Sequence, residues 1–304
     1  MKKQEEPDGN FPTCPYPNPE VQQAMELGIE CAQKNCADLL IATDPDCDRV
    51  GVAVKDGDGF KILSGNEVGV LLLDYICERR KANRDMPKDP ILIKTIVTTD
   101  LGDKIAESYG VKTINVLTGY KYIGEQITLL EKQGKLDDFI FSFEESDGYL
   151  SGTYVRDKDG VNGACLACEM YAYYRNKGIS LTDKLDDIAK RFGYYDSVLL
   201  SYEFPGSEGF VKMQSIMKKY REKPLREIGG SAIKRSLDYL DMIDNLPKAD
   251  VLKYFLEDGT TLVIRPSGTE PKLKIYLTIC GKGREDLQNK KEILTSFANE
   301  LMGE

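Results

Sequence analysis

The chain has 304 residues, of which 41% are hydrophobic and 30% charged, and its formal net charge is −9. This length suits two or three domains, and the composition excludes extensive disorder. The negative charge argues against nucleic acid as a partner, because phosphate neutralisation needs clustered Lys and Arg. No apolar run reaches the ~18 residues of a membrane span, and the N-terminus lacks the apolar core of a signal peptide. We therefore expect no membrane partner.

The cysteine and histidine content narrows the chemistry further. The chain has eight cysteines and no histidine, which removes Ser-His and Cys-His nucleophile systems. Cys165 and Cys168 have the closest spacing, but no second pair follows them to complete a zinc site. The cysteines are therefore expected to be reduced thiols of a cytoplasmic protein.

Strands and helices are predicted to alternate through the first 190 residues or so. The expected strands are residues 37–43, 50–54, 60–63, 91–97, 111–117 and 139–143. The expected helices are residues 20–35, 64–80, 100–110, 122–133 and 162–176. Ser64 and Glu67 form a capping-box pattern, and Asp100 is expected to cap the helix that follows it. Such alternation predicts an α/β fold with mixed, mostly parallel sheets covered by helices.

The pattern changes after about Arg191. The expected strands there are residues 198–204, 251–255, 261–264 and 273–279, and the expected helices are 210–222 and 285–301. Asp258 and Gly259 form a hairpin-turn dipeptide between two of these strands. The pattern of strands and helices after Arg191 predicts a separate C-terminal α+β domain.

Three carboxylates occupy alternate positions of the loop DPDCDR, residues 44–49, between two expected strands. Asp44, Asp46 and Asp48 can converge on one hard cation, because oxygen ligands suit magnesium or calcium. A calcium EF-hand is excluded, since Arg49 and Lys55 stand where that loop needs Gly and Glu. A solvated acidic turn is the alternative interpretation.

The loop EESDG, residues 144–148, follows the apolar expected strand 139–143. Glu144, Glu145 and Ser146 offer acceptors and a donor for sugar hydroxyls. Two alternatives remain for this loop. Its paired carboxylates would also suit glycoside hydrolysis, or the loop simply caps the next element.

The loop RPSGTEP, residues 265–271, combines an arginine, two hydroxyls and a glycine that permits close backbone approach. These groups suit a phosphate cradle, although a plain β-turn would use similar residues. Lys274 follows on a strand and is a further phosphate candidate. Two smaller loops, TGYK (118–121) and RDKDG (156–160), contribute lysines that are otherwise expected to be solvated.

Taken together and in this order, the loops resemble the α-D-phosphohexomutase family, whose pattern has a DPDxDR metal loop, an ExS sugar loop and an RxSGTxP-type phosphate loop. The motif FEESxGYL, together with TGYK and RDKDG, resembles the phosphoglucomutase/phosphomannomutase branch more than the other branches of the family. The family has four domains around a cleft. By this resemblance, residues 1–60 are the latter part of domain two, 61–191 are domain three and 192–304 are domain four.

The resemblance also places a domain one before Met1, with a nucleophilic serine in a T-x-S-H motif. A chain without histidine cannot contain that motif. We therefore expect the isolated chain to be inactive, whatever its loops bind. A non-catalytic module that binds sugar phosphate or metal is the alternative. The sequence favours neither glucose nor mannose, and neither a monomer nor an oligomer.

The activity implied is phosphoryl transfer between O1 and O6 of a hexose phosphate, with hexose 1,6-bisphosphate as intermediate and activator. Asp44, Asp46 and Asp48 would hold Mg²⁺. The implied catalytic residues are Arg49, Lys121 and Lys158. The implied substrate contacts are Thr118, Gly119, Glu144 and Ser146 for the sugar, and Arg265, Ser267, Gly268, Thr269 and Lys274 for the phosphate.

Overall fold

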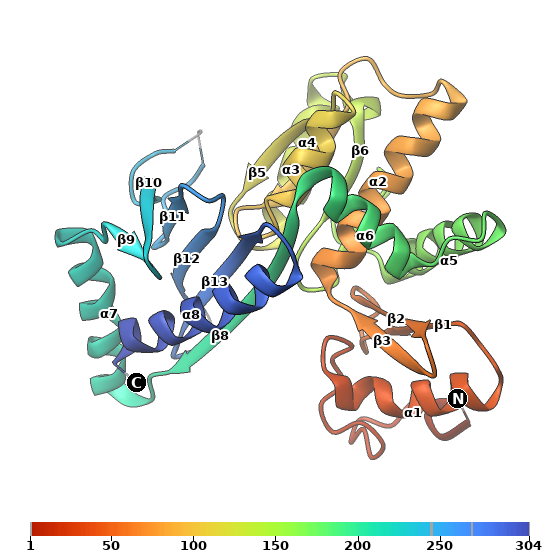
Figure 1. Cartoon of the computed structure of the whole chain (residues 1–304), viewed down its shortest axis with the longest axis horizontal. Coiled ribbons are helices and arrows are strands. Elements are labelled where there is room, and N and C mark those ends of the chain that lie inside the picture. The colour runs from red at the N-terminus through yellow and green to blue at the C-terminus, as the bar shows by residue number, and fades with distance from the viewer. Residues whose placement is uncertain (1, 244–245, 269, 304) are drawn as a thin grey trace. The chain divides into compact units, whose positions relative to one another are not determined.

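The computed structural model describes residues 2–243, 246–268 and 270–303. They form two compact units, residues 1–188 and 189–304, here called unit 1 and unit 2 (Figure 1). The expected mixed α/β architecture is present. The finer division at residues 60 and 191 stays a prediction. No helix in the described ranges is both long enough and apolar enough to cross a membrane.

Unit 1 contains two sheets. Its strands are β1 (Leu39–Thr43), β2 (Val50–Asp56), β3 (Gly59–Leu63), β4 (Ile91–Thr95), β5 (Lys112–Val116), β6 (Phe139–Phe143) and β7 (Tyr149–Leu150). The helices up to residue 192 are α1 (Gln22–Lys34), α2 (Gly65–Asn83), α3 (Leu101–Ser108), α4 (Tyr120–Lys132), α5 (Gly160–Asn176) and α6 (Leu181–Phe192), with short 3-10 turns η1 (Lys2–Gln4) and η2 (Leu136–Asp138).

The first sheet has the order β1-β2-β3 and is antiparallel throughout. Its connections are the loop 44–49 and the tight turn at 57–58, both too short for the crossover that parallel strands need. The second sheet has the order β5-β4-β6-β7. There β4 pairs in parallel with both β5 and β6, as the alternation of elements predicted, and only the short β7 is antiparallel.

The start of α2 confirms one predicted cap in full, and the start of α3 confirms the position of another but not its hydrogen bond. Ser64 Oγ accepts a hydrogen bond from the Glu67 N–H, and the Glu67 carboxylate accepts one from the Ser64 N–H at 2.9 Å. Asp100 occupies the N-cap position of α3 as predicted, but its side chain makes no capping hydrogen bond. Its carboxylate lies 3.8 Å from the buried ammonium of Lys94.

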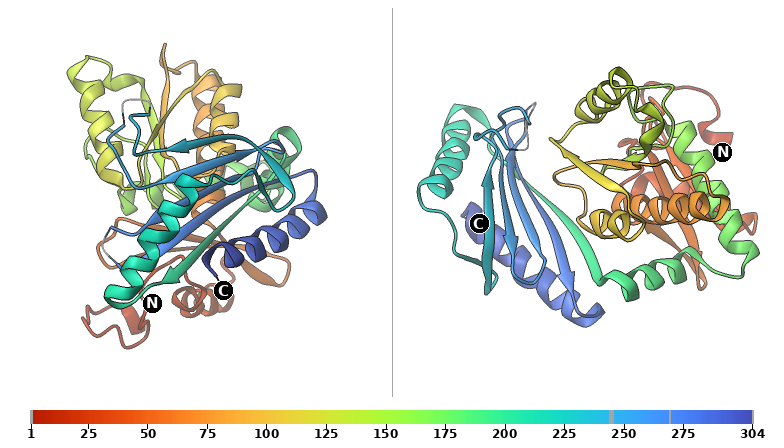
Figure 2. Two further views of the ribbon diagram at one scale, coloured as in Figure 1. Left: turned by 90° about the vertical axis from the view of Figure 1, so that its left-hand side faces the viewer. Right: turned by 90° about the horizontal axis from the view of Figure 1, so that it is seen from above.

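Unit 2 is one antiparallel sheet with two helices beside it (Figure 2). The sheet order is β8-β13-β12-β11-β10-β9. The strands are β8 (Tyr194–Glu203), β9 (Glu227–Ile228), β10 (Ser231–Asp238), β11 (Leu252–Leu256), β12 (Thr261–Pro266) and β13 (Lys272–Gly281), and the helices are α7 (Gly206–Glu222) and α8 (Arg284–Met302). Apolar residues of both helices and of one sheet face form a shared core.

Gly69 allows α2 to press against β6. A Cβ at this position would lie 2.1 Å from Cδ2 of Phe143, a fully buried ring. We predict that Gly69→Ala lowers the free energy of unfolding by about 1–3 kcal/mol, because the methyl group overpacks the core. Urea denaturation followed by circular dichroism measures the change. The matched control is Gly9→Ala, where the methyl group meets nothing within 4 Å. Equal stability of the two variants would contradict this packing argument.

Candidate functional site

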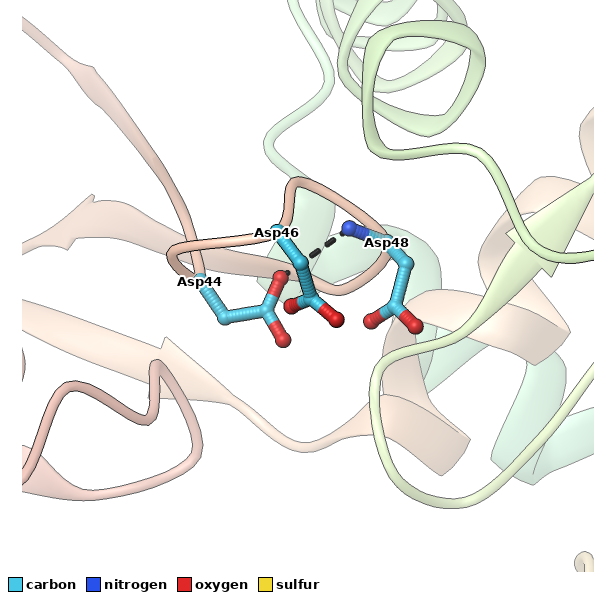
Figure 3. Close-up of side chains that lie close together, drawn as sticks. All are labelled: Asp44, Asp46 and Asp48. Carbon is cyan, nitrogen blue, oxygen red and sulfur yellow. Dashed lines mark hydrogen bonds between the residues drawn. The ribbon is translucent and has the colours of Figure 1, made fainter.

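Asp44, Asp46 and Asp48 lie together in the loop between β1 and β2 (Figure 3). One carboxylate oxygen from each residue lies within 4.8 Å of the others. The backbone sets this geometry: Asp44 Oδ1 accepts hydrogen bonds from the N–H groups of Asp48 and Arg49, both at 3.0 Å. Cys47 adopts φ = 57°, a left-handed conformation that tightens the loop. The sequence spacing thus becomes a cluster of acidic oxygens.

Two cations neutralise part of this cluster. Arg49 Nε lies 2.7 Å from Asp44 Oδ2, and Lys158 Nζ lies 2.6 Å from Asp48 Oδ2. Burial raises the pKa of the Asp44 carboxyl, but hydrogen bonds from Arg49 outweigh it, so this pKa falls below its usual range. The pKa of Asp48 is raised by burial and by the charges of Asp44 and Asp46, although Lys158 opposes the shift. Three carboxylates thus face two cations, one of which, Arg49, also pairs with Glu20.

A divalent cation fits this site. Its donors would be carboxylate oxygens, the ligands that hard cations such as Mg²⁺ prefer. The pKa of Asp48 is raised mainly by burial and also by the neighbouring charges of Asp44 and Asp46, and a bound cation would oppose both effects. Asp46 is exposed, and its carboxylate has no ion pair with any residue in the described ranges, so it is accessible to an incoming ion.

The loop 144–148 lies at the carboxyl end of β6, and backbone contacts hold it in place. The Glu144 N–H donates to the Gly148 carbonyl at 2.9 Å, which closes the loop. Gly65, the first residue of α2, packs directly on it: a Cβ there would lie 2.2 Å from the Glu145 carbonyl oxygen. The side chain of Glu144 is only 8% exposed, and Ser146 is half-buried. The two loops meet where the Val50 N–H donates to the Asp147 carbonyl at 2.9 Å.

Glu144 has an unusual protonation state. Burial raises its pKa to about 8, with a further increase from the charge of Glu145, while Lys158 and the Gly119 N–H partly oppose the shift. Near neutral pH this carboxyl is therefore mainly protonated and can both donate to and accept from a hydroxyl. The same interactions show that the structure brings the loops 118–121, 144–148 and 156–160 together.

The two candidate lysines of unit 1 have different surroundings. The side chain of Lys158 is 17% exposed, and its Nζ is 5.8 Å from the ring centroid of Tyr120. Lys121 is exposed in the first turn of α4, with its Nζ 4.9 Å from the ring centroid of Tyr122 and no ion pair to a described carboxylate. The structure thus joins Lys158, but not Lys121, to the acidic cluster.

Thr118 precedes Gly119, whose N–H approaches Glu144, and its side-chain oxygen is unsatisfied. Its Oγ1 is buried and has no hydrogen-bond partner within the described residues. A buried hydroxyl without a partner costs free energy, so such a group is expected to meet a ligand or water. This supports Thr118 as a substrate contact.

Glu20 belongs to the site but was missed by sequence reasoning. Its carboxylate lies 3.3 Å from Arg49 Nη1, so Arg49 is held between Glu20 and Asp44. Glu20 approaches because Gly51 has no side chain: a Cβ there would lie 2.6 Å from Cβ of Pro19. In the sequence, Asn18-Pro19-Glu20 signals only a helix start, and nothing local links it to Arg49.

The candidate phosphate loop of unit 2 connects β12 to β13. Arg265 and Lys274 are register partners on these strands, so their side chains share one face of the sheet. Arg265 Nη1 donates to the hydroxyl of Tyr276 at 3.5 Å, and the Ser267 N–H donates to the Lys272 carbonyl at 2.8 Å. The hairpin therefore presents two cations next to a turn with polar groups.

The turn itself leaves room for a ligand. A Cβ at Gly268 would meet nothing within 4 Å, and Thr269 lies outside the described residues. Lys272 is paired with Glu270 at 3.2 Å and with Glu203 at 3.5 Å. Arg265 and Lys274 make no such ion pair within the described ranges, so they are the better cations for an anion here.

Comparison with known proteins identifies the family. Models for phosphoglucomutase/phosphomannomutase domains match three consecutive parts of the chain: alpha/beta/alpha domain II over residues 1–57, alpha/beta/alpha domain III over residues 64–192 and the C-terminal domain over residues 212–288. The chain belongs to the phosphoglucomutase/phosphomannomutase family.

Individual relatives agree with this assignment. The phosphoglucomutase of Staphylococcus saprophyticus is 36% identical over 313 residues, covering 97% of this chain and 54% of that protein. That of Staphylococcus aureus is 35% identical over 302 residues, with 95% and 53% covered. The crystal structure of parafusin, a phosphoglucomutase from Paramecium, shares the fold with a TM-score of 0.68 at 20% identity, covering 95% of this chain and 51% of that one. The chain spans about half the length of the curated relatives it matches.

The raised pKa of Glu144 makes stability depend on pH. Between its ordinary value of 4.5 and about 8, the unfolded chain has lost this proton while the folded chain keeps it. The free energy of unfolding therefore falls as pH rises through this window, by up to about 1.4 kcal/mol per pH unit for one such group. We predict that Glu144→Gln reduces this slope, measured by urea denaturation in EDTA between pH 5 and 8. Glu107→Gln, at an exposed position, is the control. An unchanged slope in Glu144→Gln would contradict the buried, protonated carboxyl.

Proposed function

We propose that this chain supplies the metal, sugar and phosphate sites of a phosphohexomutase, which interconverts hexose 1-phosphate and hexose 6-phosphate through a hexose 1,6-bisphosphate. The observation that carries the proposal is the joining of two loops: the carboxylates of Asp44, Asp46 and Asp48 converge, and Lys158 links Asp48 to the surroundings of Glu144. Relatives named phosphoglucomutase, 35–36% identical over nearly the whole chain, support it.

Asp44, Asp46 and Asp48 would hold Mg²⁺. A magnesium ion at such a site screens the charge on phosphoryl oxygens during transfer. Arg49, held by Asp44 and Glu20, would lie beside the transferring group. Burial lowers the pKa of Lys158, but Asp48, Asp157 and Glu144 raise it by more, so Lys158 stays protonated beside both acidic loops and is better suited to positioning the substrate than to giving up a proton. Lys121, which lies outside this cluster, is retained only as a substrate contact.

The remaining residues would bind substrate. Glu144, with its protonated carboxyl, can donate to one sugar hydroxyl and accept from another. The other sugar contacts would be Ser146, in the same loop as Glu144, and Thr118 and Gly119, in the loop that approaches Glu144. The phosphate that does not react would be held by Arg265, Ser267, Gly268, Thr269 and Lys274.

Turnover requires a phosphoserine in addition to these sites. The 304 residues contain no T-x-S-H motif, since they contain no histidine. We therefore expect these residues alone to bind hexose phosphate and metal without turnover, which is also how a non-catalytic module would behave. The location in the cytoplasm stays a prediction.

Arg265 provides the test of phosphate binding. We expect Arg265→Ala to weaken binding of glucose 6-phosphate at least about tenfold, because a guanidinium–phosphate pair is lost. Isothermal calorimetry with Mg²⁺ measures the affinity. Arg226→Ala, at an exposed arginine of the same unit, makes the same change in net charge and serves as control. Equal affinity of the two variants would reject the phosphate assignment.

Asp46 provides the test of metal binding. Asp46→Asn should weaken binding of Mn²⁺, used as a spectroscopic substitute for Mg²⁺, by about tenfold or more, because one of three anionic ligands becomes neutral. Electron paramagnetic resonance of free Mn²⁺ gives the dissociation constant. Asp58→Asn, at an exposed turn of the same unit, should bind Mn²⁺ as the unsubstituted chain does. If both variants bind Mn²⁺ normally, the ion is held elsewhere.

A further inference from the structure

Lys158 lies between the metal loop and the candidate sugar loop. Its Nζ is 2.6 Å from Asp48 Oδ2 and 3.6 Å from the exposed carboxylate of Asp157. The Glu144 carboxyl is close enough to interact with it electrostatically. A single ammonium group thus faces both a candidate metal ligand and the place where a sugar phosphate would bind.

The surrounding backbone builds this position. Gly148 makes room for the lysine stem, since a Cβ there would lie 2.6 Å from Cδ of Lys158. The next two residues are tied to both sides of the site: the Asp159 N–H donates to the Tyr149 carbonyl at 3.1 Å, and the Gly160 N–H donates to the Cys47 carbonyl at 2.9 Å. These contacts fix the backbone of Lys158 beside the loop 44–49 and leave its side chain only 17% exposed.

We infer that Lys158 is a counterion of the loop 44–49. A divalent cation must displace its ammonium group from Asp48. A bound phosphate group pairs with that ammonium and so ends its competition with the cation. The inference rests on the proposed function for its second part, the response to a phosphate ester. Its first part, competition between Lys158 and the metal, rests on the proposed metal site at Asp44, Asp46 and Asp48 and on the contact of Lys158 with Asp48.

Electrostatics gives the direction of both effects. A divalent cation that binds Asp48 comes within a few ångströms of the Lys158 ammonium, and charges of the same sign repel strongly at that distance. A phosphate that pairs with Lys158 removes this repulsion, so the anion strengthens metal binding. By thermodynamic linkage, the metal strengthens anion binding by the same factor. Lys158 would therefore couple the two ligands.

A different role for Lys158 predicts the opposite result. Groups that hydrogen-bond to a metal ligand often orient it, and their loss weakens metal binding by 10- to 100-fold in typical sites. If Lys158 only orients Asp48, removing its charge lowers the affinity for metal. The sign of the change in affinity therefore separates competition from orientation.

The test measures Mn²⁺ affinity by electron paramagnetic resonance, first without any phosphate. We expect Lys158→Met to bind Mn²⁺ about tenfold more tightly than the unsubstituted chain, because one positive charge is removed beside the ion. Lys158→Arg keeps the charge and should retain the original affinity. Lys61→Met is the charge-matched control, since Lys61 pairs with Glu67 at 2.7 Å on a different segment. Unchanged or weaker binding in Lys158→Met overturns the inference. If that variant does not fold, Lys158→Gln gives the same comparison.

The second arm repeats the titrations with saturating glucose 6-phosphate, corrected for Mn²⁺ bound by the sugar phosphate in solution. We expect the sugar phosphate to tighten Mn²⁺ binding at least about fivefold in the unsubstituted chain and to have little effect in Lys158→Met. Equal tightening in both proteins overturns the coupling role. If calorimetry detects no binding of glucose 6-phosphate to any variant, the proposed function fails, while the first arm still decides whether Lys158 competes with metal.

Discussion

Repulsion among three carboxylates is the constraint on which the rest of unit 1 depends. Asp44, Asp46 and Asp48 are brought within 4.8 Å of one another by a loop too short to separate them. The structure offsets part of this repulsion with Arg49 from the same loop and Lys158 from a distant one. Lys158 lies in the segment before α5, and it contacts Asp48 while the Gly160 N–H donates to the Cys47 carbonyl. The Val50 N–H donates to the Asp147 carbonyl, which brings the loop 144–148 to the same place. Charge compensation and backbone hydrogen bonds thus join the same loops.

Glycines allow the backbones of these loops to pack closely against one another. Gly65 lets the start of α2 contact the backbone of the loop 144–148, and Gly148 leaves the space that the Lys158 side chain occupies. Gly160 approaches the Cys47 carbonyl so closely that a Cβ would lie 2.5 Å from it. A side chain at any of these three glycines would push apart the segments that carry the paired charges. Packing and electrostatics therefore support the same arrangement.

Much of this site could be predicted from sequence because its motifs are local. The loops 44–49, 144–148 and 265–271 each span only a few residues, and β6 was predicted with its bounds, residues 139–143. The misses have a different origin. Glu20 reaches Arg49 across 29 positions of sequence, and the preference of Asp100 for Lys94 depends on a buried ammonium that no local pattern reveals. The strand β10 was missed because most of its residues are exposed or half-buried, so they show no apolar alternation.

The central claim is that the acidic loop holds a divalent cation beside a sugar-phosphate site. Anomalous diffraction from crystals of the chain soaked in Mn²⁺ and glucose 6-phosphate tests it most directly. The account predicts one Mn²⁺ peak, with an oxygen from each of Asp44, Asp46 and Asp48 at about 2.1–2.2 Å, and Lys158 turned from Asp48 toward the phosphate. A peak elsewhere, or none in crystals that bind the sugar phosphate, would contradict it.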